Sequence, residues 1–270
     1  MRIQKLIIAC MFGALAPITH AQESALSLAA TQPAKGRITW REQARFERYE
    51  LGNEEIDQFT IDTRLVYGVS KDIALTLNVP TVLRDRENGF DDQHGLGDTT
   101  LSLKWRFWQH DPGPIDTNRL ALLAGVRLPT GTDGLSSDGW DPMLGLIFTR
   151  VSGRHGVNAA VTYLVSTDGL ANPISAGTGT DDLLTLETSY LYRLAPSEYT
   201  SDTHASWYFT AESFVDYETN GDLAWRIAPG ILYEARRFTV ELSPIVPIVN
   251  EIDHRAELEW GLALGLRVLF

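Results

Sequence analysis

The last fifteen residues of the chain, Ala256 to Phe270, alternate between apolar side chains and small or charged ones. The apolar positions are Leu258, Trp260, Leu262, Leu264, Leu266, Val268 and Phe270, and the positions between them include Glu257, Glu259, Gly261, Gly265 and Arg267. A period of two is that of a β-strand, since helical spacing would scatter these residues around an axis. One long hydrocarbon face and one polar face predict a strand with lipid on one side and a polar lumen on the other.

The same alternation recurs along the chain and divides it into about twelve segments. We expect strands near residues 37–50, 55–70, 72–84, 96–110, 117–129, 142–152, 155–167, 182–195, 203–217, 221–234, 236–249 and 256–270. An even count suits an antiparallel bacterial barrel, and closure pairs the backbone groups that an open edge would leave unpaired in hydrocarbon. The sequence therefore predicts an all-β fold, an antiparallel transmembrane β-barrel of about twelve strands in the outer membrane of a Gram-negative cell.

Aromatic residues separate this prediction from its alternative, a soluble β-sandwich that would bury them in a core and use shorter strands. In a membrane barrel they collect on the outward face at both interfaces. We expect Tyr67, Phe107, Phe148, Tyr192, Trp207, Tyr233, Phe238 and Phe270 at one interface, and Phe59, Tyr163, Tyr217, Trp225 and Trp260 at the other. This distribution at two ends favours the barrel.

The connections predict the orientation. Several short ones follow even-numbered strands, whereas the long ones, 84–94, 129–141 and 166–182, follow odd-numbered strands. Short periplasmic turns and long outer loops are typical of such barrels, so both chain termini are predicted to be periplasmic. The strand at 37–50 fits least well, because its charges fall on both faces, and we expect it to run partly outside the bilayer or in a protected seam. Pro244 and Pro247 mark the place where the wall could be interrupted.

Residues 1–21 read as a secretory signal peptide with a basic start, an apolar stretch and a small-residue cleavage site. Cys10 offers the alternative of a lipidated N-terminus, but the apolar stretch before it is too short. Residues 22–36 are small and polar and predict a flexible periplasmic leader, and residues 37–270 form the barrel. The formal net charge of −12 and the lack of a basic stripe argue against a nucleic-acid partner.

Charged residues of both signs fall on the inward register and form the candidate site. They are Arg64, Lys104, Arg106, Arg127, Glu187, Glu212, Arg226, Glu241, Glu259 and Arg267. Such charges either form a constriction that selects solutes or pair into a plug that fills a narrow barrel. The sequence leaves both interpretations open.

Catalysis and metal binding are weaker hypotheses. A hydrolase needs a histidine beside a serine or among acidic residues, and only His94 with Asp91 and Asp92 loosely meets that demand. Acidic loops are more often simply solvated, so we expect no enzyme activity, no cofactor and no metal. The Gly95-Leu96-Gly97-Asp98 element opens a strand and lacks a following lysine, which excludes a phosphate loop.

Three motifs resemble a known family. These are Gly95-Leu96-Gly97-Asp98, Arg127-Leu128-Pro129-Thr130-Gly131-Thr132, and Tyr67-Gly68-Val69 before Asp72 and Val79-Pro80. Together they resemble the proteobacterial outer-membrane family labelled as the MetA pathway of phenol degradation, over most of the chain. The resemblance implies a barrel that passes small, including aromatic, molecules. It also implies that the terminal Phe270 is the signal read by the barrel-assembly machinery.

Two hypotheses of function follow. The first is a narrow passive channel for small organic solutes, with lipid and lipopolysaccharide as its surroundings. The alternative is a plugged structural barrel whose acidic loops bind lipopolysaccharide or divalent cations, and an outer-membrane hydrolase comes third.

Overall fold

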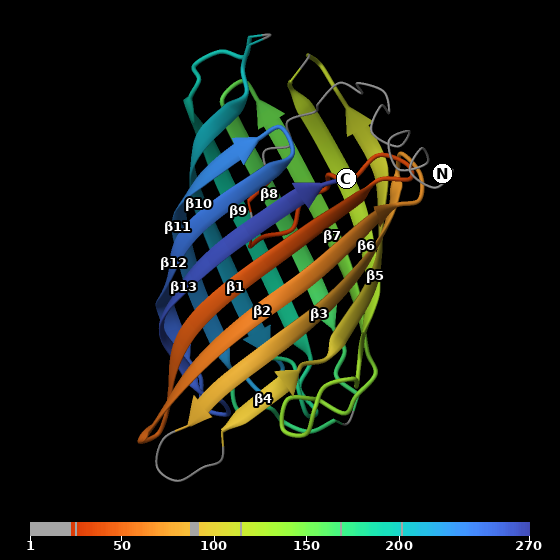
Figure 1. Cartoon of the computed structure of the whole chain (residues 1–270). Coiled ribbons are helices and arrows are strands. Elements are labelled where there is room, and N and C mark those ends of the chain that lie inside the picture. Colours follow the sequence, from red (N-terminus) through yellow and green to blue (C-terminus); the bar gives the residue numbers. More distant parts are fainter. Residues whose placement is uncertain (1–22, 25, 87–91, 114, 168, 201) are drawn as a thin grey trace, which may run out of the picture.

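The computed structural model describes residues 23–24, 26–86, 92–113, 115–167, 169–200 and 202–270 (Figure 1). The predicted signal peptide, 1–21, lies outside these residues. The strands are β1 (Ile38–Leu51), β2 (Glu54–Gly68), β3 (Ile73–Arg86), β4 (Gln93–Leu96), β5 (Thr99–His110), β6 (Thr117–Leu128), β7 (Asp141–Ser152), β8 (His155–Leu164), β9 (Leu183–Ala195), β10 (Ala205–Glu218), β11 (Leu223–Ala235), β12 (Phe238–Glu251) and β13 (Glu257–Leu269). In the described part of the chain, no helix is long and apolar enough to cross a membrane.

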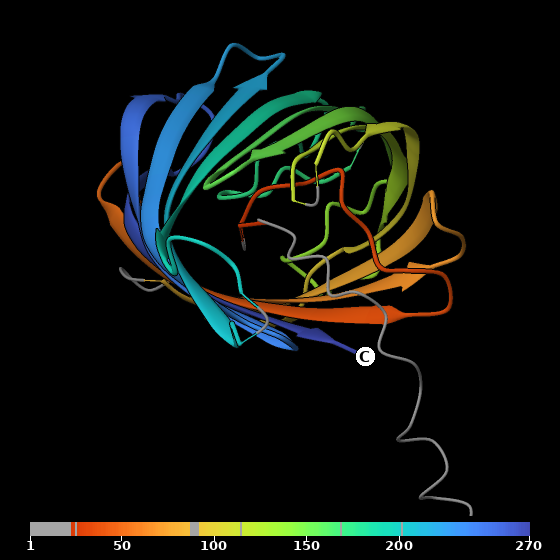
Figure 2. The same cartoon turned by 90° about the horizontal axis from the view of Figure 1, so that it is seen from above.

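The strands form one closed antiparallel barrel. Neighbours in sequence pair with each other, and β1 pairs with β13 from Thr39↔Leu269 to Glu50↔Glu257, which closes the wall. Figure 2 shows the closed cylinder from above. Closure gives the strands of the wall a partner on both sides, so the backbone groups inside hydrocarbon are hydrogen-bonded within the wall.

Thirteen strands over the described residues make twelve positions in the wall. The short β4 pairs with the last part of β3, and β5 pairs with the first part. The two therefore form one strand interrupted at Gly97 and Asp98, where the Gly97 amide donates to the carbonyl of Pro80 at 2.9 Å. The prediction of a barrel of about twelve strands is confirmed.

The barrel has an apolar outside and a polar inside. Its outward face exposes aliphatic and aromatic side chains, among them Tyr67, Phe107, Trp207, Phe238 and Phe270 at one end and Phe59, Tyr163, Tyr217, Trp225 and Trp260 at the other. The end formed by the connections 129–140, 165–182, 219–222 and 252–256 is called the loop end, and the opposite end, where β1 begins and β13 ends, the turn end. Two aromatic belts with apolar residues between them are typical of a membrane wall.

Strand β1 lies fully in the wall, although the sequence allowed for a position partly outside it. Its outward charges have partners: Glu42 accepts hydrogen bonds from the indole of Trp40 at 2.7 Å and the hydroxyl of Thr63 at 3.0 Å. Arg48 makes two 2.7 Å hydrogen bonds to Asp57 on the neighbouring strand β2. Pairing of this kind lowers the cost of placing a charge on the outward face.

A β-bulge changes the inward register of β13 near the loop end. The pairing with β1 shifts between Arg48 and Tyr49, so that Leu258 faces the lumen and is buried. Glu257 and Glu259 are exposed instead. The prediction that Glu259 faces the lumen is therefore wrong, because strict alternation along a strand fails at a bulge.

The N-terminal segment, defined as residues 23–36, runs inside the barrel. Figure 2 shows it crossing the interior before it joins β1. Glu23, Ser24, Ser27 and Ala30 are buried there. This differs from the predicted flexible leader in the periplasm, because small and polar side chains suit a narrow polar lumen as well as they suit solvent.

The wall is interrupted beside the prolines of β12. Its pairing with β13 ends at Ile245↔Gly261, just before Pro247. Above that point the Asn250 side-chain amide donates to the carbonyl of Leu258 at 2.8 Å. A proline cannot donate to a ladder, so a side chain bridges the two strands here.

Substituting Leu264 with Arg tests the membrane-facing assignment of the wall. Leu264 lies near the middle of β13 and is 49% exposed on the outward face. We expect a loss of about 2–4 kcal/mol in the free energy of unfolding in lipid vesicles, measured by urea titration. The control Leu269→Arg, at the turn end, costs about 0–1 kcal/mol. Equal losses for the two variants would contradict the assignment.

Candidate functional site in the barrel lumen

Ionic contacts hold the start of the N-terminal segment. The Glu23 carboxylate pairs with Arg41 of β1 and accepts a 2.6 Å hydrogen bond from Arg267 of β13. Arg267 also donates to Glu234 of β11 at 2.9 Å. These side chains lie in the lumen and are largely buried, so the segment is tied to β1 and β13 by charge-assisted bonds, and Arg267 connects them to β11.

Backbone groups of the segment are hydrogen-bonded to inward side chains further along. The amide of Ser27 donates to Glu212 at 2.7 Å, that of Leu28 to Glu187 at 2.8 Å, and that of Ala30 to the hydroxyl of Thr149 at 2.8 Å. Lys104 donates to the carbonyls of Ala29, at 2.7 Å, and of Thr31. An irregular backbone inside a membrane barrel needs such partners.

Apolar contacts complete the fit of the segment. Ala30 packs in a cluster with Ala121, Leu123, Ile147 and Ala160 of the wall. Leu26 packs on a second cluster that contains Phe214 and Ala228. The lumen wall therefore has apolar patches where the segment crosses it.

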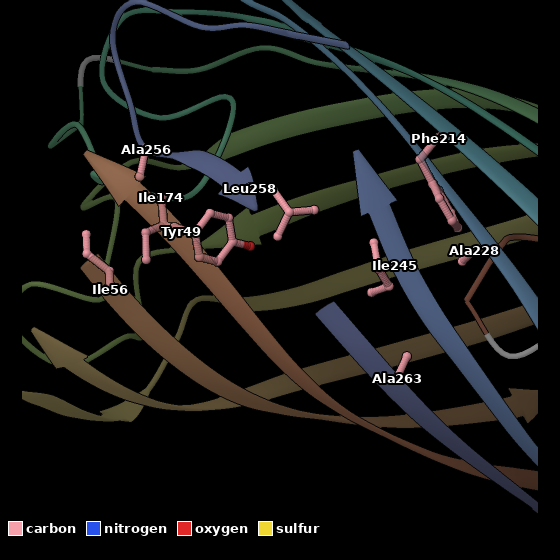
Figure 3. Close-up of a cluster of buried hydrophobic side chains, with 9 residues drawn as sticks. All are labelled: Tyr49, Ile56, Ile174, Phe214, Ala228, Ile245, Ala256, Leu258 and Ala263. Atoms are coloured by element: carbon pink, nitrogen blue, oxygen red, sulfur yellow. The ribbon is translucent and has the colours of Figure 1, made fainter. Parts of the chain in front are cut away.

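A long connection folds into the loop end. Ile174, from the connection 165–182, is buried against Tyr49, Ile56 and Leu258 (Figure 3). The side chain of Arg84 in β3 donates to Asn172 at 3.2 Å.

Two further contacts hold the same connection from other strands. Arg127 donates to the carbonyl of Gly177, and the amide of Gly177 donates to Glu218 at 2.9 Å. Arg255 also donates to Glu218, at 2.6 Å. The connection thus narrows the mouth of the barrel.

A cavity of about 390 Å³ lies between the N-terminal segment and this connection. Part of its wall is apolar, with Leu26, Tyr49, Ile174, Phe214, Ile245 and Leu258. Another part is polar, and its charged residues are Arg45, Glu47, Asp62, Arg64, Glu187, Asp216, Arg226 and Arg255. The size and the mixed lining suit a small organic molecule.

Several of these charges are paired between neighbouring strands. Arg45 contacts Asp62 at 2.9 Å, and Arg226 contacts Asp216 at 2.9 Å. Arg64 differs, because among the described residues it forms no ion pair and makes one long hydrogen bond, 3.5 Å from its Nε to Asn78.

The structure places nine of the ten predicted lumen residues on the inward side. Arg64, Glu187 and Arg226 line the cavity, while Lys104, Glu212 and Arg267 hold the N-terminal segment. Glu241 accepts a 2.6 Å hydrogen bond from Thr210, Arg127 pairs with Asp141 at 2.6 Å at the loop end, and Arg106 pairs with Asp72 at 3.1 Å at the turn end. Glu259 lies outside the lumen.

The residues that sequence reasoning missed belong to the two segments that enter the lumen. Glu23, Leu26 and Ile174 have no period of two around them, so nothing in the strand pattern marked them. The available signal was the large set of inward charges on the wall, since buried charges need partners.

The glycine of the Tyr67-Gly68-Val69 motif lets the N-terminal segment enter the barrel. A side chain on Gly68 would place its Cβ 2.3 Å from the carbonyl oxygen of Ala34. The Gly36 amide donates to the Gly68 carbonyl at 2.7 Å. Only glycine allows this approach of two backbones.

The other two motifs bind each other at the loop end. One carboxylate oxygen of Asp98 accepts hydrogen bonds from the amide of Gly131 at 3.0 Å and from the hydroxyl of Ser136 at 2.8 Å. Its other oxygen accepts the amide of Ser137 at 2.7 Å and the Ser137 hydroxyl at 2.8 Å. The two elements therefore form one structural unit that shapes the connection 129–140.

The weaker hypotheses concerned a catalytic group around His94 and metal binding by the acidic loops. Asp91 lies outside them, and two histidines have polar side-chain partners, His155 with the hydroxyl of Tyr190 and His254 with Asp222. Within the described ranges, no three His, Cys, Asp or Glu side chains come together as a metal site requires. Asp141 is instead held by Arg127, Ser137 and Thr167.

A solved structure of an outer-membrane channel shares this architecture. The COG4313 outer membrane channel from Pseudomonas putida F1 matches with a TM-score of 0.62 at 13% identity, over 92% of this chain and 100% of that one. The beta domain of the Bordetella autotransporter BrkA matches with a TM-score of 0.47 at 13% identity, over 87% and 100% of the two chains. No curated protein matches the sequence.

A closed antiparallel barrel with an apolar outer face, aromatic belts and a polar, partly filled lumen defines the class: an outer-membrane β-barrel. A family model described as "Putative MetA-pathway of phenol degradation" matches residues 35–233. The chain belongs to this family, as its motifs indicated.

Substituting Asp98 with Asn tests the unit formed by the two motifs. Burial raises the pKa of Asp98, but hydrogen bonds from Ser137, Ser136 and Gly131 outweigh it and hold the pKa below its ordinary value. A lowered pKa stabilises the folded state above about pH 4, and this contribution is lost as the pH falls through the folded pKa. We expect the amides of Gly131 and Ser137 to exchange hydrogen faster in the variant at pH 7. The free energy of local opening should fall by about 1–3 kcal/mol.

The difference between wild type and Asp98→Asn shrinks on acidification, because the wild-type carboxylate becomes protonated. Ser189→Ala, which removes a hydroxyl that accepts a hydrogen bond from Asn158 in the lumen, is the control and leaves both exchange rates unchanged. Unaltered exchange at Gly131 and Ser137 in Asp98→Asn would show that the two motifs do not depend on each other.

Proposed function

We propose that this protein is a narrow passive channel for small organic solutes, closed at rest by its own N-terminal segment. The observation that carries the proposal is the cavity of about 390 Å³ inside the barrel, bounded by that segment and by the connection 165–182. Membership of a family described by a pathway of phenol degradation supports organic solutes as the cargo. The apolar and charged walls of the cavity suit molecules that have both kinds of surface.

The same proposal assigns an orientation. We infer that the loop end faces outward from the cell and that both termini are periplasmic, since long outer loops and short inner turns are usual in bacterial barrels. Lipid and lipopolysaccharide then surround the apolar wall. The exposed terminal Phe270 serves as the signal for the barrel-assembly machinery.

The path requires the N-terminal segment to move. The segment is not a strand of the wall, so it can leave the lumen without breaking the ladder that closes the barrel. Its bonds to Glu187, Glu212, Thr149 and Lys104 hold it in place until then. A solute that enters the cavity from the loop end meets this segment before it reaches the turn end.

A plugged structural barrel is the second candidate, and the filling of the lumen from both ends favours it. In that case the segment stays in place and the loops carry the function, by binding lipopolysaccharide or divalent cations. Deleting residues 87–94 would then abolish the binding of that partner, whereas a channel would keep its conductance.

Removing residues 22–32 from the mature protein tests the channel. We expect single-channel conductance in planar bilayers to rise several-fold, because the contacts that close the lumen are lost. Liposome swelling with phenol, sugars and amino acids then reports which solutes pass. A length-matched Gly/Ser replacement of 22–32 separates loss of contacts from loss of chain and should also conduct more.

The fold of each variant is checked by the shift in gel mobility on heating. A folded deletion variant that conducts no better than the wild type would refute the channel and favour the structural barrel.

A further inference from the structure

A group of cations lies beside the cavity, and one of them, Arg64, also lines it. Four cations, Arg41, Arg64, Lys104 and Arg267, surround the start of the N-terminal segment, and the two carboxylates bound to them are Glu23 and Glu234. Lys104 bonds to carbonyl groups, and Arg64 forms no ion pair among the described residues. The acidic side chains near Arg64 have other partners.

Two of those acids also line the cavity. Asp62 contacts Arg45 at 2.9 Å, and Glu187 accepts the amide of Leu28 at 2.8 Å. Because Asp62 and Glu187 bind these other groups, the guanidinium of Arg64 faces the cavity with no carboxylate of the described residues in contact.

Arg64 connects two spaces. It lines the cavity of about 390 Å³ and also a small adjoining pocket formed with Glu23, Arg41 and Arg267. The Nε atoms of Arg41 and Arg267, two residues that line this pocket, are buried and have no hydrogen-bond partner among the described residues. Guanidinium groups bind carboxylates with paired donors. Arg41 and Arg267 therefore each keep one N–H donor that a second carboxylate could use.

We propose that the cavity is a binding site for organic carboxylates, and that Glu23 occupies its anion position when no solute is present. The apolar body of the solute lies against Leu26 and Phe214, and its carboxylate binds Arg64 and then competes with Glu23 for Arg41 and Arg267. Exchange of one carboxylate for the other releases the start of the N-terminal segment. This inference rests on the proposed channel and names both its substrate class and its opening signal.

The competition follows from the geometry of Glu23. Its carboxylate is the group that ties the start of the segment to β1 and β13. A solute carboxylate offers the same two oxygens to the same donors. A neutral or cationic analogue of equal size offers none and leaves Glu23 in place.

The test measures binding of benzoate, benzyl alcohol and benzylamine to the full mature protein in lipid nanodiscs, by titration calorimetry with empty nanodiscs as reference. We expect benzoate to bind more tightly than both analogues. The Arg64→Gln variant should weaken benzoate binding by about tenfold or more, since a hydrogen bond to a charged group is lost. The Glu23→Gln variant should bind benzoate more tightly than the wild type, because its internal competitor is gone.

The matched control is Arg119→Gln. Arg119 bonds to Thr117 at 3.1 Å near the turn end, forms no ion pair among the described residues and lines neither space. It should leave benzoate binding unchanged. Equal affinity for benzoate and benzyl alcohol, or equal losses in Arg64→Gln and Arg119→Gln, would overturn the site.

Liposome swelling separates this inference from the proposed channel. Benzoate binding that depends on Arg64 but is accompanied by no permeability would support the site and refute the channel. Permeability to neutral solutes without benzoate binding would refute the site and leave the channel standing.

Discussion

Every feature of this molecule depends on the pairing of backbone groups in a medium that contains no water. Hydrocarbon offers no partner to an unpaired amide or carbonyl, so the sheet has to close, and the ladder between β1 and β13 closes it. Closure then reverses the usual arrangement of side chains. Apolar residues dominate the outward face, and polar residues line a narrow interior, apart from paired groups such as Glu42 and Arg48 on the outward face of β1.

A charge confined to that narrow interior is costly unless it has a partner. Some partners come from neighbouring strands, as with Arg226 and Asp216. Others come from segments that are not part of the wall, above all Glu23 and the backbone of residues 27–31. The filling of the lumen is therefore the means by which the wall satisfies many of its inward polar groups.

The family motifs serve this arrangement. Gly68 provides the room by which the N-terminal segment enters, and Asp98 holds the connection that begins with the Pro129-Thr130-Gly131 element. Arg64, which lines both the cavity and the adjoining pocket, lies outside these motifs.

The sequence by itself determined the barrel, its twelve wall positions, its aromatic belts and nine of the ten inward charges, because these follow from a local period of two. Only the tertiary structure decided three things: the bulge that turns Glu259 outward, the entry of residues 23–36 into the lumen, and the burial of Ile174 at the loop end. Each of these depends on contacts between groups far apart in the chain, such as Glu23 with Arg267, and no local pattern records such contacts.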